Sequence, residues 1–243
     1  MKRKIAVLIG WITVWEILSR ILSNPVVFAG PADTLRTLVR LAGTSGFWLS
    51  CLCTFLCAIG GITCGMVLAV GLAVLSVRTK WGYDVISPAV RIMRSVPAVA
   101  FIVLILLWSK NRAVSFYVSA VVVLPVFYAA FLAGNRAVDP QMKEMADSYA
   151  MKPMARFRYL VYPAVYPFLL SAAETAVGMG FKSAAAAEVI GQVRGTIGNG
   201  IYMAKVYLSA EELFAWTAAV VLLSFAAEKA VLFLLRKSGG ENR

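Results

Sequence analysis

Long apolar segments are the sequence feature that most limits how this chain can fold. A helix needs about 20 mainly apolar residues to cross the hydrocarbon core of a bilayer, which is about 30 Å thick. The chain is 60% hydrophobic and 15% charged, whereas soluble domains are about 25% charged. We therefore expect an all-α membrane protein whose residues 1–243 form a single transmembrane domain. The predicted spans are 5–22, 47–77, 85–108, 114–133, 168–190 and 213–235.

The basic residues indicate how these spans are oriented. The net charge is +12, but the lysines and arginines lie between apolar segments and not on one polar face, so no nucleic acid partner is expected. Six spans place both termini on one side of the bilayer, and positively charged loops stay in the cytoplasm during insertion. The side with the termini would hold fifteen basic residues and the other side seven, which predicts that both termini are cytoplasmic. The fifteen are Lys2, Arg3, Lys4, Arg78, Lys80, Arg91, Arg94, Arg136, Lys143, Lys152, Arg156, Arg158, Arg236, Lys237 and Arg243; the seven are Arg20, Arg36, Arg40, Lys110, Arg112, Arg194 and Lys205.

Several kinds of chemistry have no residues to support them. Histidine, the commonest metal ligand and general base, is absent. Cys51, Cys53, Cys57 and Cys64 lie in one apolar segment without a CxxC pair, and we interpret them as small buried apolar side chains, so neither a metal nor another cofactor is expected. The sequence contains no GxxxxGK[ST] phosphate-binding loop and no convincing pair of nucleophile and base. The chain is therefore not expected to be an enzyme, and any ATP with its Mg²⁺ would be bound by a partner.

Three local patterns modify the picture of straight spans. Pro88 and Pro97 lie in the third predicted span, where each removes a backbone hydrogen-bond donor and restricts the preceding residue, so a kink or a late helix start is expected. Residues 35–42 alternate apolar residues and arginines at helical spacing, which predicts a short interfacial helix outside. Tryptophans near the predicted span ends are typical of the membrane interface. They are Trp48, Trp81, Trp108 and Trp216.

The cytoplasmic connection 134–167 is much longer than two neighbouring helices need. Asp139-Pro140 can cap and start a short helix. Pro153 then breaks the chain and can start a second short helix, which we expect to end at Tyr162-Pro163. The sequence thus predicts two short helices with a turn between them on the cytoplasmic face.

The same connection contains a recognisable series of residues, namely Val138-Asp139-Pro140, Glu144-Met145-Ala146, Ala150, Pro153, Phe157-Arg158 and Pro163-Ala164. This series resembles the EAA loop of ABC importer permeases. In that family the loop docks a coupling helix into a groove of the ATPase subunit. The resemblance implies ATPase-coupling roles for Glu144, Ala146, Ala150, Pro153, Phe157, Arg158 and Pro163. Met145 and Ala150 depart from the family pattern, which has alanine and glycine at these positions.

These residues also predict which face of the coupling helix would enter the ATPase groove. Ala146 and Ala150 are four residues apart, so we expect them to share one small face that can enter a groove. The charge of Glu144 suits the positive end of the first short helix. In the family, glycine occupies the position of Ala150 and can adopt a positive φ at little cost, whereas a positive φ costs alanine roughly 1 kcal/mol or more. We therefore expect Pro153, and not Ala150, to define the turn between the two short helices.

Two further segments extend the resemblance to nearly the whole chain. They are Arg94-Ser95-Val96-Pro97 before 101–108, and the series Lys182-Ser183, Ala187-Glu188-Val189-Ile190-Gly191, Gly195-Thr196-Ile197-Gly198, Ala204-Lys205 and Leu213-Phe214-Ala215-Trp216. Both are similar to permeases of the nitrate, sulfonate and taurine type. The resemblance implies a type I ABC importer permease-like bundle in a bacterial inner membrane, with two ATPase subunits, a second permease copy as a homodimer and an extracytoplasmic substrate-binding protein. The implied cargo is a small, usually anionic solute such as a sulfonate, nitrate or taurine, or else a vitamin precursor. An ion-gradient-driven secondary transporter is the alternative, but it would leave 134–167 without a role.

Charged residues within predicted spans are costly in lipid unless they face a cavity or a partner. Lys182 and Glu188 are therefore candidates for the translocation path, together with Arg94 and Pro97 from the resemblance. Six residues separate Lys182 from Glu188, about 9 Å of rise along a helix, so the two cannot pair directly. For both side chains a structural role remains the alternative. Glu16 and Arg20 are four residues apart and are expected to form a local ion pair.

Two further segments carry one expectation each, namely the first apolar segment and the glycine-rich stretch after the fifth predicted span. The first apolar segment lacks a convincing small-residue cleavage site after it, so we expect a retained helix and not a signal peptide. After Ile190, four glycines make one straight helix unfavourable and predict a bend or a re-entrant segment. They are Gly191, Gly195, Gly198 and Gly200. The resemblance implies an outer gate at Gly195 and Gly198, and a plain exposed loop is the alternative.

Overall fold

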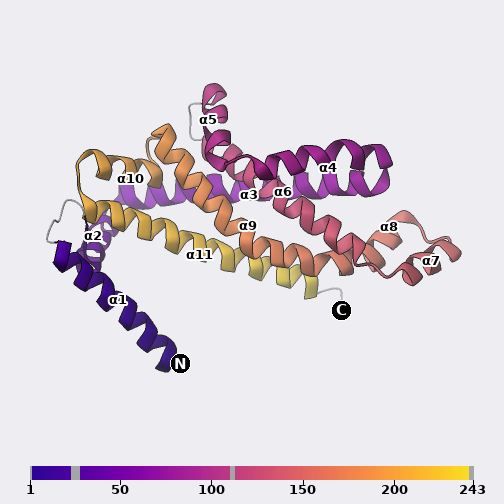
Figure 1. Ribbon diagram of the computed structural model, residues 1–243, viewed down its shortest axis with the longest axis horizontal. Helices are drawn as coiled ribbons and strands as arrows, with labels where there is room; N and C mark the ends of the chain where they lie inside the picture. Colours follow the sequence, from indigo (N-terminus) through magenta and orange to yellow (C-terminus); the bar gives the residue numbers. More distant parts are fainter. Residues whose placement is uncertain (1, 23–27, 110–112, 241–243) are drawn as a thin grey trace.

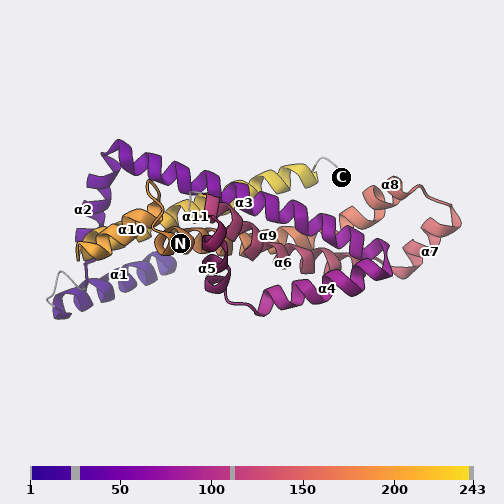
Figure 2. The same cartoon turned by 90° about the horizontal axis from the view of Figure 1, so that it is seen from above.

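A computed structural model describes residues 2–22, 28–109 and 113–240 of the chain. Every regular element among these residues is a helix. The elements are α1 Lys2–Leu22, α2 Pro31–Ala42, α3 Ser45–Arg78, α4 Lys80–Ser95, α5 Ala98–Trp108, α6 Ala113–Arg136, α7 Pro140–Ser148, α8 Pro153–Arg156, the π-helical turn η1 Phe157–Val161, α9 Tyr162–Gly191, α10 Ile197–Val206 and α11 Ala210–Gly240. Two views place α7 and α8 at one end of an elongated molecule, and α2 and α10 at the other (Figures 1 and 2).

Four helical segments among the described residues are long and apolar enough to cross a membrane, or five if the bent pair α4 and α5 counts as one span. They are α3, α6, the continuous run Pro153–Gly191 and Ala210–Lys237 of α11. The predicted all-α, multi-span character is confirmed. The predicted span 5–22 lies in α1, which is not among the four, so a count of six stays a prediction.

The third predicted span, 85–108, is not a straight helix. Its two halves, α4 and α5, meet at Val96 and Pro97 with a bend of 103°. Pro97 cannot donate its backbone nitrogen and restricts Val96 to extended geometry, and Val96 has φ −78° and ψ 127°. Pro88 is accommodated inside α4. The predicted kink is therefore confirmed, and Pro97 is the proline that produces it.

The core lies where α3, α6 and α9 meet, and small residues let the helix backbones approach closely. A methyl group built on Gly61 would lie 2.2 Å from the carbonyl oxygen of Phe116 in α6, and one on Gly65 would lie 2.5 Å from that of Ala120. The GxxxG spacing of these two glycines is the pattern that allows tight packing of membrane helices. Phe127 of α6 and Phe181 of α9 fill the space around this contact and are fully buried.

The connection between α6 and α9 is partly as predicted. The carboxylate of Asp139 accepts a hydrogen bond of 2.9 Å from the backbone N–H of Gln141 and caps α7, and Pro140 follows at the first position. The expected end of the second short helix at Tyr162-Pro163 is wrong, because α8 continues through η1 into α9. The N–H of Tyr162 bonds to the carbonyl of Phe157, five residues back. This wider turn gives the helix room to continue into Pro163 without breaking.

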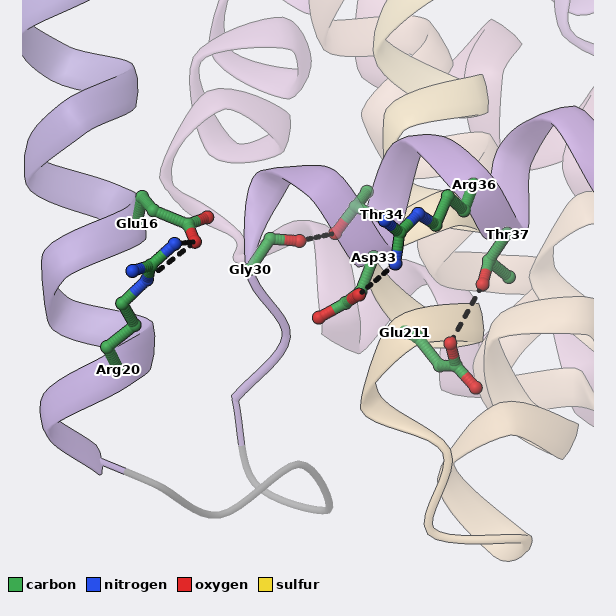
Figure 3. A network of polar contacts seen from close by, with 8 residues as sticks. All are labelled: Glu16, Arg20, Gly30, Asp33, Thr34, Arg36, Thr37 and Glu211. Atoms are coloured by element: carbon green, nitrogen blue, oxygen red, sulfur yellow. Dashed lines mark hydrogen bonds and ion pairs between the residues drawn. The ribbon is translucent and has the colours of Figure 1, made fainter.

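At the other end, polar contacts join α2 to α11 (Figure 3). The Thr37 hydroxyl of α2 donates to the Glu211 carboxylate at 3.0 Å. The predicted pair of Glu16 and Arg20 in α1 is confirmed, with an N–O distance of 2.9 Å. The predicted helix near 35–42 is confirmed as part of α2. Of the four tryptophans, Trp48, Trp81 and Trp108 are exposed, but Trp216 packs on Gly200 and is buried, so its interpretation as an interface residue is wrong.

Candidate functional site

A sharp turn ends α7 and sets the direction of α8. Ala150 adopts a left-handed backbone with φ 47°. The N–H of Met151 bonds to the carbonyl of Ala146, and the N–H of Ala150 bonds to that of Asp147, both at 3.0 Å. This pair of bonds defines a Schellman motif, in which glycine usually occupies the left-handed position. Ala150 therefore makes the turn itself, and the expectation that Pro153 would define it is wrong. An ion pair between Arg156 and Asp147 holds the two short helices together.

Replacing Ala150 with glycine is expected to stabilise the protein. Glycine removes the steric cost of a Cβ in the left-handed region, about 1 kcal/mol, which corresponds to a rise in Tm of about 2–4 °C for a chain of this size. Thermal unfolding of the purified protein measures this shift. Ala155→Gly in α8 is the matched control, and it should lower Tm because its backbone is helical. A lower Tm for Ala150→Gly would contradict the turn geometry.

The exposed face of α7 differs from the expected one. Ala146 is 2% exposed and packs against the protein itself, and Ala150 lies beyond the end of the helix. The prediction that these alanines share a docking face is therefore wrong. Met142, Met145 and Tyr149 are instead 50%, 48% and 79% exposed. Their spacing of three and four residues places them on one side of the helix, and we call them the α7 stripe.

The other predicted coupling residues surround this stripe. Glu144, Pro153, Arg158 and Pro163 are exposed. Phe157 is half-buried and lines a cavity of about 170 Å³ with Arg78, Asn135 and Arg156, among other residues. The spacing of three and four residues between the members of the α7 stripe is visible in the sequence and is the signal that identifies this face. The resemblance to the EAA loop indicates the alanines instead.

One face of α9 is polar although the helix lies among apolar segments. Ser171, Thr175 and Lys182 are exposed and follow one another at intervals of four and seven residues, so they form a polar α9 stripe. Most of the large exposed side chains of α3 and α11 are apolar by contrast, for example Leu56 and Phe225. A lysine facing lipid is costly, so the polar α9 stripe is suited to face water or another protein.

The structure brings only some of the predicted path residues together. Arg94 is exposed in the last turn of α4, and Pro97 is exposed at the bend before α5. Lys182 lies on the exposed side of α9, whereas Glu188 lies on its buried side. Among the residues that the structure describes, no ion pair joins Arg94 or Lys182 to Glu188.

Glu188 is fully buried, with 0% of its surface exposed. Its Oε2 accepts hydrogen bonds from the Thr54 hydroxyl of α3 at 2.9 Å and from the Gly198 N–H of α10 at 3.1 Å. Its Oε1 accepts one from the Ser115 hydroxyl of α6 at 2.9 Å. The carboxylate is therefore bound by three helices besides its own. Neither Thr54 nor Ser115 was a predicted site residue, since nothing local in the sequence connects them to Glu188.

The segment after α9 is bent, as predicted. α9 ends at Gly191, Gln192 has φ 49°, and Gly195 has φ 74° in the following turn. The next two glycines lie inside α10 and not in a loop. A methyl group on Gly198 would lie 2.2 Å from Cβ of Glu188, and one on Gly200 would lie 2.4 Å from the Trp216 ring. Both glycines permit close packing of α10 on its neighbours.

Comparison with known proteins adds to this geometry. Residues 61–237 match the family described as the binding-protein-dependent transport system inner membrane component. The taurine transport system permease protein TauC of Escherichia coli (strain K12) is 24% identical over 253 residues, covering 98% of this chain and 90% of the relative. The putative aliphatic sulfonates transport permease protein SsuC of the same organism is 24% identical over 186 residues, covering 75% of this chain and 70% of the relative.

A solved structure has a similar fold. The crystal structure of an amino acid ABC transporter with histidines aligns with a TM-score of 0.61 and 20% sequence identity, covering 76% of this chain and 90% of that one. At this identity the likeness concerns the fold alone.

Proposed function

The chain belongs to the family of binding-protein-dependent transport system inner membrane components, and we propose that it carries a small anion across the bacterial inner membrane as the permease of an ATP-binding-cassette importer. The relatives named for taurine and for aliphatic sulfonates support an organic sulfonate as cargo. A sulfonate carries a permanent negative charge. An importer of such cargo needs positive charge or hydrogen-bond donors along its path, where the anion leaves water.

The observation that carries this proposal is the polar α9 stripe. Lys182 is an exposed cation within a helix that is apolar enough to span the membrane. Ser171 and Thr175 add hydroxyl groups on the same side. Such a surface lines the path of the anion in our proposal, and Arg94 and Pro97 contribute from the broken α4 and α5. An ion-gradient-driven transporter is not favoured, because the matched family consists of inner membrane components of binding-protein-dependent transport systems.

The partners follow from the same assignment. We propose that the α7 stripe docks into an ATPase subunit, with Glu144, Pro153, Phe157, Arg158 and Pro163 shaping the segment around it. Two permease copies, two ATPase subunits and an extracytoplasmic substrate-binding protein form the working importer, and ATP with Mg²⁺ is bound by the ATPase. The fifteen-to-seven distribution of basic residues supports cytoplasmic termini. The C-terminal end of α11 points towards the end of the molecule that holds α7 and α8 (Figure 1), in agreement with a cytoplasmic C-terminus.

Replacing Lys182 with methionine is expected to lower sulfonate uptake by at least about tenfold, because a charge-assisted contact with the anion contributes about 1.5–3 kcal/mol. Lys182→Arg should retain most of the uptake, since the positive charge remains. The measurement is uptake of radiolabelled taurine or alkanesulfonate into vesicles that contain the complete importer. ATPase co-purification reports whether the complex still assembles.

Lys229→Met is the matched control for this experiment. Lys229 is also exposed within a membrane helix, but it lies on α11 and outside the polar α9 stripe. Its replacement should leave uptake close to wild type. Equal uptake by Lys182→Met and wild type would remove Lys182 from the path. Failure of Lys182→Met alone to assemble would instead assign it to a structural contact.

A further inference from the structure

The start of α10 is held by side chains from other helices. The first residues of a helix have backbone N–H groups without partners inside the helix. In α10 the N–H of Ile197 donates to the Thr54 hydroxyl at 3.1 Å, and that of Gly198 donates to Glu188 at 3.1 Å. The N–H of Asn199 donates to the Thr196 hydroxyl at 3.2 Å. Three successive donors are thus satisfied, two of them by residues of α3 and α9.

Glu188 connects these contacts into one unit. The Thr54 oxygen accepts the Ile197 N–H and donates its own proton to Oε2 of Glu188, while the Ser115 hydroxyl donates to Oε1. Gly198 rests directly on the Glu188 side chain, because even a methyl group there would lie 2.2 Å from its Cβ. Four helices are therefore joined through one carboxylate, which has no cationic partner within the described residues.

The helix that carries Glu188 links this hydrogen-bond network to the opposite end of the molecule. α9 is the end of a continuous helical run, Pro153–Gly191, that begins directly after the α7 turn. Glu188 lies one turn before the end of this run, where it meets α10. A displacement of α8 can therefore be carried along one helix to Glu188 and passed to α10 through hydrogen bonds and direct packing. An ordinary cap needs only a hydroxyl group, so a buried carboxylate is more than the helix start requires.

We propose that Glu188 is a positioning residue that ties α10 to α9, α3 and α6, so that α10 moves as one body with the helix that leads from the coupling end. The proposal goes beyond the importer assignment and rests on it for the coupling role of the end that holds α7 and α8. Glu188 acts in this role through the position of its two oxygens. It is not a contact for the transported anion, which its burial keeps away.

Substitutions of Glu188 separate position from charge. Glu188→Gln keeps the length: its carbonyl can accept from Thr54 and Gly198, and its amide can donate to the Ser115 oxygen. Glu188→Asp keeps the charge but is one methylene shorter, so it cannot reach all three donors. The proposal predicts that the glutamine variant retains uptake within about threefold, while the aspartate variant loses about tenfold or more, as expected for lost buried hydrogen bonds. A role of the charge itself predicts the opposite order and would overturn the proposal.

Amide hydrogen exchange tests the contact without reference to transport. In the purified complex with its ATPase and binding protein, exchange at residues 197–199 should be about tenfold faster in Glu188→Asp than in wild type, and near wild type in Glu188→Gln. Exchange in the α6 core should stay unchanged in both variants, which excludes global unfolding. Equal protection of 197–199 in all three proteins would overturn the proposal. If the wild-type complex carries no sulfonate, the proposed function fails, but the exchange result still decides the role of Glu188.

Thr54→Val provides a second variant in case Glu188→Asp does not fold. Valine keeps the shape of threonine but removes the hydroxyl that links Ile197 to Glu188. Exchange at Ile197 should become faster and stimulation of ATP hydrolysis by the loaded binding protein should fall, while basal hydrolysis persists. Thr63→Val is the matched control, since Thr63 is an exposed threonine on the same helix. Identical exchange and stimulation in the two valine variants would count against the proposal.

Discussion

Replacing Gly61 with leucine is expected to prevent the membrane domain from folding. Even a methyl group at this position would lie 2.2 Å from the carbonyl oxygen of Phe116 and 2.9 Å from Cβ of Ser119. The nearest atom belongs to the backbone of α6 and cannot rotate away. α3 and α6 would have to separate by more than 1 Å, given that ordinary carbon contacts need about 3.5 Å. The separation would open the core around Phe127 and Phe181.

The size of the effect follows from how membrane helices associate. Apolar side chains gain little by leaving lipid, so close packing supplies most of the attraction between α3 and α6. Overpacking a core with flexible side chains costs about 1–3 kcal/mol, and a rigid backbone contact leaves less room for adjustment. We therefore expect the Gly61→Leu variant to yield little monodisperse protein in size-exclusion chromatography after extraction from membranes.

Gly71→Leu is the control that isolates this contact. Gly71 lies on the same helix, and a methyl group there would meet nothing within 4 Å. The added leucine is equally apolar and should be tolerated, with a yield near that of wild type. A well-folded Gly61→Leu protein would mean that α3 and α6 do not pack as described.

The parts of this fold that depend on neighbouring residues could be predicted from the sequence. Apolar length indicates the spans because a membrane helix satisfies its own backbone hydrogen bonds. The start of α7 at Asp139-Pro140 and the pair of Glu16 and Arg20 each involve residues within four positions of one another. Physical rules for caps and helical spacing apply directly at this range.

The parts that depend on distant residues could not be predicted. Thr54 and Ser115 are 134 and 73 residues away from Glu188 in the chain. The sequence indicates that a buried carboxylate needs partners, but tertiary packing alone decides which helices supply them. The 103° bend at Pro97 is similar, since a proline permits a break whose angle depends on the neighbouring helices. The continuation of α8 through η1 needed a wider turn that proline statistics do not anticipate.

Replacing Met145 with glutamate is expected to abolish coupling to the ATPase while leaving the spans in the membrane. Met145 is the middle residue of the α7 stripe, between Met142 and Tyr149. Methionine and tyrosine are flexible or amphipathic apolar groups that suit burial at a protein interface. A carboxylate at this position would have to leave water on docking, which costs several kcal/mol if no cation meets it. An interface centred on such a residue loses at least about a hundredfold in affinity for a cost of about 3 kcal/mol.

Two control variants test whether the apolar face is what matters. Gln141→Glu adds the same charge to an exposed position of α7 outside the stripe, and it should retain the ATPase. Met145→Leu keeps an apolar side chain and should also retain it. The measurement is the amount of ATPase that co-purifies with the permease, together with sulfonate uptake into vesicles. Both quantities should fall to background for Met145→Glu, while the amount of permease in the membrane stays constant, because α7 lies outside the spanning segments. Normal co-purification and uptake by Met145→Glu would show that the α7 stripe does not contact the ATPase, and the coupling surface would then have to lie on α8 or on the exposed side of η1.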